Sequence, residues 1–213
     1  MKILFLLSIL GLVVVGQAKV FDRQVLSYAP IPEGTYVPPK KSGEVTLFDF
    51  IRSRDDLSEL AKVVSEAPGF AQAFDTSVNW QYTFFAPSNT AFNNTGQYYN
   101  EFAGTPKGQW WVGQMLQHHY IPNSILYAAN FTEEKTRIQS GSYLFIGAQL
   151  VDGSLVLNNA ATVVDKDRPV TNGIVHVIDR ILAGDSMIYE GDIKKTTQGF
   201  IPGSCSDPNL PYC

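Results

Sequence analysis

The sequence has few of the residues on which thiol or metal chemistry depends. Its 213 residues include only two cysteines, and both of them, Cys205 and Cys213, lie close to the end of the chain. It has three histidines, His118, His119 and His176, and none stands in a His-Glu-x-x-His or paired-cysteine pattern. Such patterns hold zinc ligands at a fixed spacing. The sequence therefore predicts no metal site, no cofactor and no thiol nucleophile.

Motifs typical of hydrolases and nucleotide-binding proteins are also missing. The chain contains no Gly-x-Ser-x-Gly elbow, no Gly-x-Gly-x-x-Gly turn and no phosphate loop. Carboxylates such as Asp165, Asp167 and Asp179 are present, but acid pairs occur in any domain and their spacing here identifies no chemistry. We expect a protein that binds rather than catalyses. An extracellular enzyme is the least supported alternative, because only these unassigned carboxylates favour it.

Charge of one sign is nowhere concentrated. The chain has 16 Lys and Arg against 20 Asp and Glu, a formal net charge of -4, and the basic residues are scattered. A protein that follows a phosphate backbone needs a basic patch, often interleaved with aromatic residues. Nucleic acid is therefore excluded as an expected partner.

The longest apolar run lies at the N-terminus and is too short to cross a membrane. It extends over Ile3–Val15, follows Lys2 and ends in the small residues before Lys19. This is the layout of a signal peptide over residues 1–18, with cleavage after Ala18. A membrane anchor is the alternative, but a spanning helix needs about 20 apolar residues. We expect a secreted, extracellular product without stable membrane insertion.

Two covalent modifications are expected in an exported chain. The sequons at Asn93 and Asn130 have no proline in their middle position and can accept N-glycans on surface loops. Cys205 and Cys213 are close in sequence and mature where thiols oxidise, which favours a disulfide between them. A pair of thiols that bridges to another chain is the alternative.

The pattern along the mature chain predicts one α+β domain. Residues 19–44 form a proline-rich arm that we expect to be extended and weakly packed, residues 45–185 form the domain, and residues 186–213 form a tail with the disulfide. Helices come first: one that Thr46 caps with Asp49 three residues on, then 56–67, a short one capped by Ser88, and one around 110–118. Strands are predicted at 80–85, 143–146, 149–151, 155–157, 162–164 and 174–178, with a hairpin turn at 152–153.

Two long segments resemble the signatures of fasciclin (FAS1) domains. They are YTFFAPSNTAF at Tyr82–Phe92 and NGIVHVIDRIL at Asn172–Leu182, in the order and separation typical of the family. Between them, Leu116–Ile121 resembles the tyrosine-histidine segment of that family, with His119 at its histidine and His118 where a tyrosine usually stands. The resemblance covers about residues 45–185. It implies a wedge-shaped β-sandwich with helices packed on one side, in a protein of cell adhesion or matrix contacts.

The resemblance and the composition together give the candidate contact residues. The segment His118, His119, Tyr120 and Ile121 is carried over from the family, although a solvated or partly packed histidine pair is the simpler interpretation. The aromatic pairs Tyr98-Tyr99 and Trp110-Trp111 are most simply core residues. If they are exposed in part, they form an apolar patch that can grip a sugar, a lipid-like ligand or a protein.

Two other polar residues are expected to be structural. His176 shares a strand face with Ile174 and Ile178, so its ring should be buried and hydrogen-bonded. Asn89 is expected to bond the local backbone at a helix start.

The favoured function is a module for cell adhesion or for matrix or cell-wall interaction, whose partner is a cell-surface or matrix protein or glycan. The signal peptide, the sequons and the fasciclin-like signatures motivate it. The alternative is an extracellular carrier of a small apolar ligand such as a carotenoid, because some fasciclin-like proteins hold pigments between helices and sheet. The aromatic content around Tyr98 to Trp111 motivates that alternative.

Overall fold

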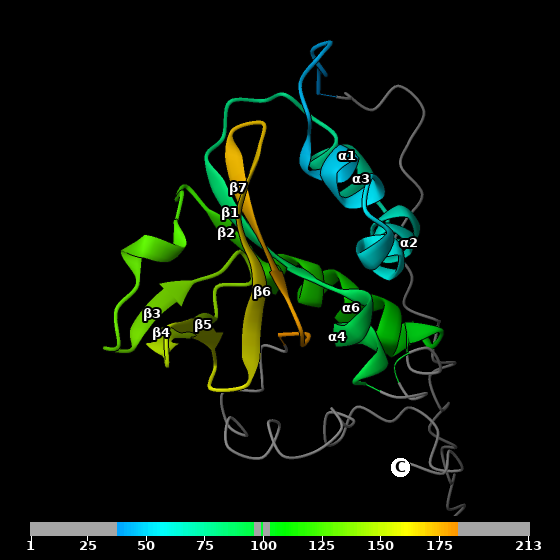
Figure 1. Ribbon diagram of the computed structural model, residues 1–213. Coiled ribbons are helices and arrows are strands. Elements are labelled where there is room, and N and C mark those ends of the chain that lie inside the picture. Colours follow the sequence, from blue (N-terminus) through cyan, green and yellow to red (C-terminus); the bar gives the residue numbers. More distant parts are fainter. Residues whose placement is uncertain (1–37, 96–98, 100–102, 183–213) are drawn as a thin grey trace, which may run out of the picture.

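The structure, a computed structural model, describes residues 38–95, 99 and 103–182, and it places helices against one side of a folded sheet (Figure 1). Seven strands are hydrogen-bonded in the order β2-β1-β7-β6-β5-β4-β3. The strands are β1 Tyr82–Pro87, β2 Tyr120–Pro122, β3 Thr136–Gln139, β4 Phe145–Val151, β5 Ser154–Leu157, β6 Ala161–Val170 and β7 Gly173–Ile178. The helices are α1 Leu47–Arg52, η1 Asp55–Leu57, α2 Ser58–Glu66, α3 Phe70–Phe74, α4 Asn89–Asn93, α6 Pro106–His119 and η2 Ala128–Asn130.

Strand alternation divides the interior into two cores. In β1, Phe84 and Ala86 belong to the core between sheet and helices, whereas Phe85 belongs to the core inside the sandwich. In the same way, Val177 of β7 faces the helices and Ile178 faces the sandwich interior, where it meets residues of β4 and β5. The predicted α+β sandwich with helices on one side is therefore confirmed.

The two fasciclin-like segments lie side by side although 79 residues lie between them in the sequence. They contain β1 and β7, which pair in parallel from Tyr82↔Gly173 to Pro87↔Ile178. The other strand pairs are antiparallel. Gly173 is needed at this register because a Cβ there would lie 2.6 Å from the Tyr82 ring.

Most of the local expectations are confirmed. Thr46 and Asp49 form the predicted capping box of α1, and the Ser88 hydroxyl caps α4 by accepting from the Ala91 amide over 3.3 Å. Asp152 and Gly153 both have positive φ, as a two-residue hairpin turn between β4 and β5 requires.

Some elements differ from the expectation. The Pro68-Gly69 pair does end α2, but Gly69 at φ 84° also starts the unpredicted helix α3. The predicted strands at 143–146 and 149–151 form the single strand β4, which starts only at Phe145, because the small residues between the two runs continue the ladder while adding no hydrophobic signal. The first strand begins at Tyr82, which leaves Trp80 outside it.

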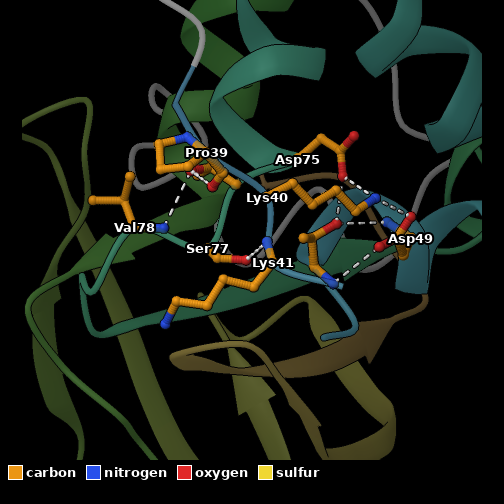
Figure 2. Close-up of polar contacts among 9 residues, drawn as sticks. Pro39, Lys40, Lys41, Asp49, Asp75, Ser77 and Val78 are labelled. Atoms are coloured by element: carbon orange, nitrogen blue, oxygen red, sulfur yellow. Dashed lines mark hydrogen bonds and ion pairs between the residues drawn. The ribbon is translucent and has the colours of Figure 1, made fainter. Parts of the chain in front are cut away.

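The last residues of the proline-rich arm are hydrogen-bonded to the domain (Figure 2). Lys40 Nζ lies 2.7 Å from Asp49 and 2.6 Å from Asp75, and the Lys41 amide donates to Ser77 Oγ over 2.8 Å. The Ser77 amide donates back to the Pro39 carbonyl over 3.0 Å. Weak packing was expected here. The side chains of Lys40 and Lys41 are exposed, but the backbone is hydrogen-bonded to Ser77, and the Lys40 side chain bridges Asp49 of α1 and Asp75 after α3.

Candidate interaction site

Helix α6 brings the tyrosine-histidine segment to the edge of the sheet. The helix starts at an N-cap, Thr105, whose side chain accepts from the Gly108 amide over 3.0 Å. It ends at His119, and the chain continues at once into edge strand β2. β2 pairs with β1 in the register Phe84↔Tyr120 and Thr83↔Ile121.

His119 is a buried cross-link. Its side chain is fully buried, its Nδ1 lies 2.7 Å from the Met115 carbonyl, and its Nε2 accepts from the Leu182 amide over 2.9 Å. Because a carbonyl can only accept and an amide can only donate, the ring carries its proton on Nδ1. Burial lowers the pKa of His119 to about 3.

His118 joins α6 to the turn between β3 and β4. Its ring is 1% exposed, and its Nδ1 lies 2.9 Å from the hydroxyls of both Ser140 and Ser142. Burial lowers the pKa of His118 to about 4. The prediction of a solvated or partly packed pair is wrong, because both rings are buried. His118 lies against the β3–β4 turn, and His119 lies between the Met115 carbonyl and the Leu182 amide.

The His118 cluster has some but not all parts of a hydrolytic site. A histidine beside a serine hydroxyl is the arrangement of a base and its nucleophile. Here both Ser140 and His118 are almost completely buried, and within the described residues the His118 Nε2 has no hydrogen-bond partner to orient it. The contacts of His118 with Ser140 and Ser142 link α6 to the turn between β3 and β4.

His176 and Asn89, the other two polar residues considered from the sequence, have structural roles. His176 is fully buried, accepts from the Asp167 amide over 3.3 Å and lies 2.8 Å from the Leu126 carbonyl, which confirms the prediction of a satisfied core histidine. Asn89 bonds across helices rather than locally. It accepts from the Glu59 amide and donates to the Asp55 carbonyl, so it ties α4 to the start of α2.

Of the four predicted contact residues in this segment, only Tyr120 reaches the surface. Ile121 points into the sandwich and is 1% exposed, like the two histidines. Tyr120 lies on the helix side of the sheet, with its ring stacked 5.3 Å from that of Tyr82 and 6.3 Å from that of Phe74. Tyr120 is therefore the partly exposed residue of the segment, and it packs against the core between sheet and helices.

A groove of about 860 Å³ lies beside Tyr120. Its walls come from α3, the end of α6, the edge strands β2 and β3, and the turn between β3 and β4. β2 and β3, the first and last strands in the hydrogen-bonded order, therefore line the same groove. The Gly141 amide donates to the Tyr120 carbonyl over 2.7 Å and joins the β3–β4 turn to the start of β2.

Two exposed aromatic residues line this groove and were not singled out from the sequence. Trp80 is 61% exposed and Tyr143 is 83% exposed. The alternating pattern assigned both of them to strands. Their exposure was missed because alternation indicates which residues share a face but not which face remains uncovered. Tyr143 instead occupies the hairpin turn, at φ 66°.

The other predicted contact residues lie away from the groove. Tyr99 and Trp111 are partly buried on α6 and the adjoining chain, with ring centroids 6.2 Å apart. Trp110 is 54% exposed on α6. Tyr98 lies outside the described residues, as do Cys205 and Cys213.

Both sequon asparagines are accessible. Asn93 is exposed at the end of α4, and Asn130 is exposed and lines the groove. The Asn130 Oδ1 accepts from the Tyr127 amide over 2.9 Å. This contact uses the oxygen and leaves the side-chain nitrogen, the atom that carries an N-glycan.

The described residues contain no candidate metal site and no candidate membrane-spanning helix. They contain no cluster of three or more His, Cys, Asp or Glu side chains able to hold a metal ion. No helix in the same residues has both the length and the apolar character of a membrane span.

The comparison with protein families identifies the domain. The fasciclin domain model matches residues 55–184, which is more than half of the chain. The chain therefore belongs to the fasciclin domain family, and the resemblance found in its two signature segments is confirmed.

Similar proteins and structures agree with this assignment. The chain is 30% identical over 81 residues to fasciclin-like arabinogalactan protein elcF of Phaeosphaeria nodorum, covering 38% of this chain and 26% of that protein. It is 29% identical over 107 residues to transforming growth factor-beta-induced protein ig-h3 of Sus scrofa, covering 50% and 15%. The chain thus matches about a quarter or less of the length of these two relatives.

A solved structure shares the fold. A FAS1 domain pair from the insect cell adhesion molecule fasciclin I matches with a TM-score of 0.56 and 18% identity, over 65% of this chain and 50% of that one. This likeness concerns the fold alone.

Proposed function

We propose that the protein is a secreted fasciclin module that attaches to cells, matrix or cell-wall polymers by binding a protein or a glycan. The observation that carries the proposal is the groove beside Tyr120, whose rim has the exposed rings of Trp80 and Tyr143. Exposed aromatic side chains are enriched where proteins bind partners, because they give a large contact area for little loss of conformational entropy. The proposal assigns no catalytic role.

The N-terminal apolar run and the exposed sequons support export, and the relatives support attachment. The N-terminal run predicts a signal peptide, and the two sequon asparagines are exposed, as N-glycosylation requires. One similar protein is named an arabinogalactan protein, and the matching structure comes from a cell adhesion molecule. We also propose the Cys205–Cys213 disulfide and glycans on Asn93 and Asn130, which peptide mass spectrometry of the secreted protein would detect.

Attachment can be measured directly. The full chain is purified from the secretion medium and immobilised, and the retention of cells and of soluble wall or matrix polymers is compared with that of an unrelated secreted protein. We expect retention by the natural chain, a loss of ten-fold or more in W80A, and little change in W110A, which removes an equally exposed tryptophan away from the groove. Absence of retention, or equal retention by the natural chain, W80A and W110A, would overturn the proposal.

The carrier of a small apolar ligand is the second candidate, because Phe70, Phe74 and Leu116 also line the groove and its volume suits a small molecule. The mass of the secreted protein under native and denaturing conditions, with an absorption spectrum, separates the two functions. A mass excess lost on denaturation, with visible absorbance, supports the carrier. Equal masses apart from glycan support attachment.

A further inference from the structure

We propose that the groove beside Tyr120 binds a neutral oligosaccharide chain, whose sugar rings stack on Trp80 and Tyr143. This inference rests on the proposed function and specifies its partner as a glycan rather than a protein. It is built from the exposed rings, the hydrogen-bonding groups beside them, the charge of the lining and the size of the groove.

The exposed rings supply apolar platforms. A sugar ring has a face of C–H groups, and the face of an aromatic ring carries partial negative charge that attracts them. Trp80 comes from the chain before β1, and Tyr143 from the turn between β3 and β4. Because these two segments are far apart in the sequence, only the fold assembles the pair around one groove.

The backbone at Tyr143 is unfavourable for the residue that occupies it. Tyr143 has φ 66°, and its amide donates to the Ser140 carbonyl over 3.0 Å in the hairpin turn. Gly or Asn is the usual residue at such a left-handed position, where a bulky side chain costs about 1 kcal/mol or more. The ring buries little area in return, since it is 83% exposed. A strained and exposed ring at the rim of a groove indicates a role in binding.

Residues with carboxamide side chains also line the groove. The side chains of Gln117 and Asn123 line the groove and make no hydrogen bond within the described part of the chain. Gln139 adds a third carboxamide, whose nitrogen makes only a long contact of 3.5 Å with the Tyr143 carbonyl. A carboxamide offers both a donor and an acceptor, which matches a sugar hydroxyl.

The charge of the lining favours a neutral ligand. Among the described residues that line the groove, Arg137 is the only charged one, and its guanidinium lies over the Phe145 ring at 4.4 Å. A polyanion would need several cations, and a basic peptide would need carboxylates. The groove, about 860 Å³ and open to solvent, has the volume of a small-ligand site, and a longer glycan can continue beyond its ends.

The test uses defined oligosaccharides and the full secreted chain after enzymatic removal of its N-glycans, because the glycan proposed on Asn130 would lie at the groove. Hexasaccharides of β-1,4-glucose, β-1,3-glucose and β-1,4-N-acetylglucosamine are titrated by isothermal calorimetry, and the matching polysaccharides are used in pull-downs. We expect binding of at least one hexasaccharide. Its affinity should fall at least ten-fold in W80A and in Y143G, while W110A and Y127A, which remove exposed rings outside the groove, should bind as the natural chain does.

Three results would overturn the inference, and they separate it from the proposed function. Absence of sugar binding, with attachment to cells stripped of glycans that W80A abolishes, would show a protein partner in the groove and leave the attachment function standing. Absence of both sugar binding and attachment would overturn both proposals. Sugar binding that W110A removes and W80A does not would place the sugar site on α6.

Discussion

The imidazole of His119 accepts a hydrogen bond from the backbone amide of Leu182 over 2.9 Å. The same ring lies 2.7 Å from the Met115 carbonyl one turn earlier in α6. It therefore joins the end of α6 to the chain that follows β7, in a region without access to water. In this chain the histidine of the fasciclin-like segment supports the surface that Tyr120 presents.

Loss of this link should destabilise the domain. H119A leaves the Leu182 amide buried without a partner and removes a packed ring, so we expect the free energy of unfolding to fall by about 2 to 4 kcal/mol. Urea unfolding followed by fluorescence measures the change. W110A, an exposed substitution on the same helix, should stay within about 0.5 kcal/mol. A loss from H119A no larger than that of W110A would contradict the structural role.

The free energy of unfolding should decrease as the pH is lowered, before the carboxylates become protonated. Burial lowers the pKa of His118 to about 4 and of His119 to about 3, and it also lowers the pKa of His176. In the unfolded chain these rings take up protons below about pH 6.5, whereas the native rings remain neutral. The unfolded state thus binds more protons between about pH 6.5 and 4, and the free energy of unfolding falls in that window by up to about 1.4 kcal/mol per pH unit for each ring.

Unfolding at a series of pH values tests this dependence. H118N should reduce the slope because it removes one of the buried rings. The ion pairs of Asp49 and Asp56, whose pKa is lowered by Lys40 and Arg54 respectively, contribute a further loss only at lower pH, as the carboxylates protonate. Equal stability at pH 7 and pH 4.5 would contradict the assignment of neutral native histidines.

The capping box at the start of α1 should be worth a measurable part of the stability. The buried Thr46 hydroxyl accepts from the Asp49 amide over 3.2 Å and donates to Asp75 over 2.8 Å. T46A removes both bonds, and we expect a loss of about 1 to 2 kcal/mol in thermal or urea unfolding. S53A removes an exposed hydroxyl that donates to the Phe50 carbonyl at the other end of the helix, and because that bond is exposed the variant should change stability by less than about 0.5 kcal/mol.

Substitution of Tyr143 should separate binding from stability. Y143G removes the ring and relieves the left-handed backbone, whereas Y143A removes the ring and keeps the strain. We expect Y143G to be more stable than Y143A by about 1 kcal/mol and at least as stable as the natural chain. Thermal unfolding of the three proteins measures this order. If both variants were equally destabilised, the ring would be a structural element and not an exposed platform.

Local chemistry accounts for the elements that the sequence predicted well. The Thr46 cap, the Ser88 cap and the Asp152-Gly153 turn depend on side chains and dihedrals within a few residues of one another. Such signals act whatever the rest of the chain does. Helix α3 was missed because Pro68-Gly69 stops one helix and gives no information on the start of the next.

The candidate site depended on residues that are distant in the sequence. Tyr120 was predicted through a family segment, but Trp80 and Tyr143 carry no local mark of exposure. A periodic pattern cannot tell a strand residue that another layer covers from one left at an open edge. The same limit applies to His118, whose burial depends on a turn 22 residues later in the chain.

By itself, the sequence determined the two fasciclin-like signatures, the α+β class, the helix caps and the hairpin turn, because neighbouring residues decide backbone conformation. It also determined that one face of β7 would bury His176. Only the tertiary structure decided that the histidines of α6 are core cross-links and that a groove lies between edge strands β2 and β3. Those features arise from the parallel pairing of β1 with β7 and from the folding of the sheet over itself, which bring together groups that no sequence window contains.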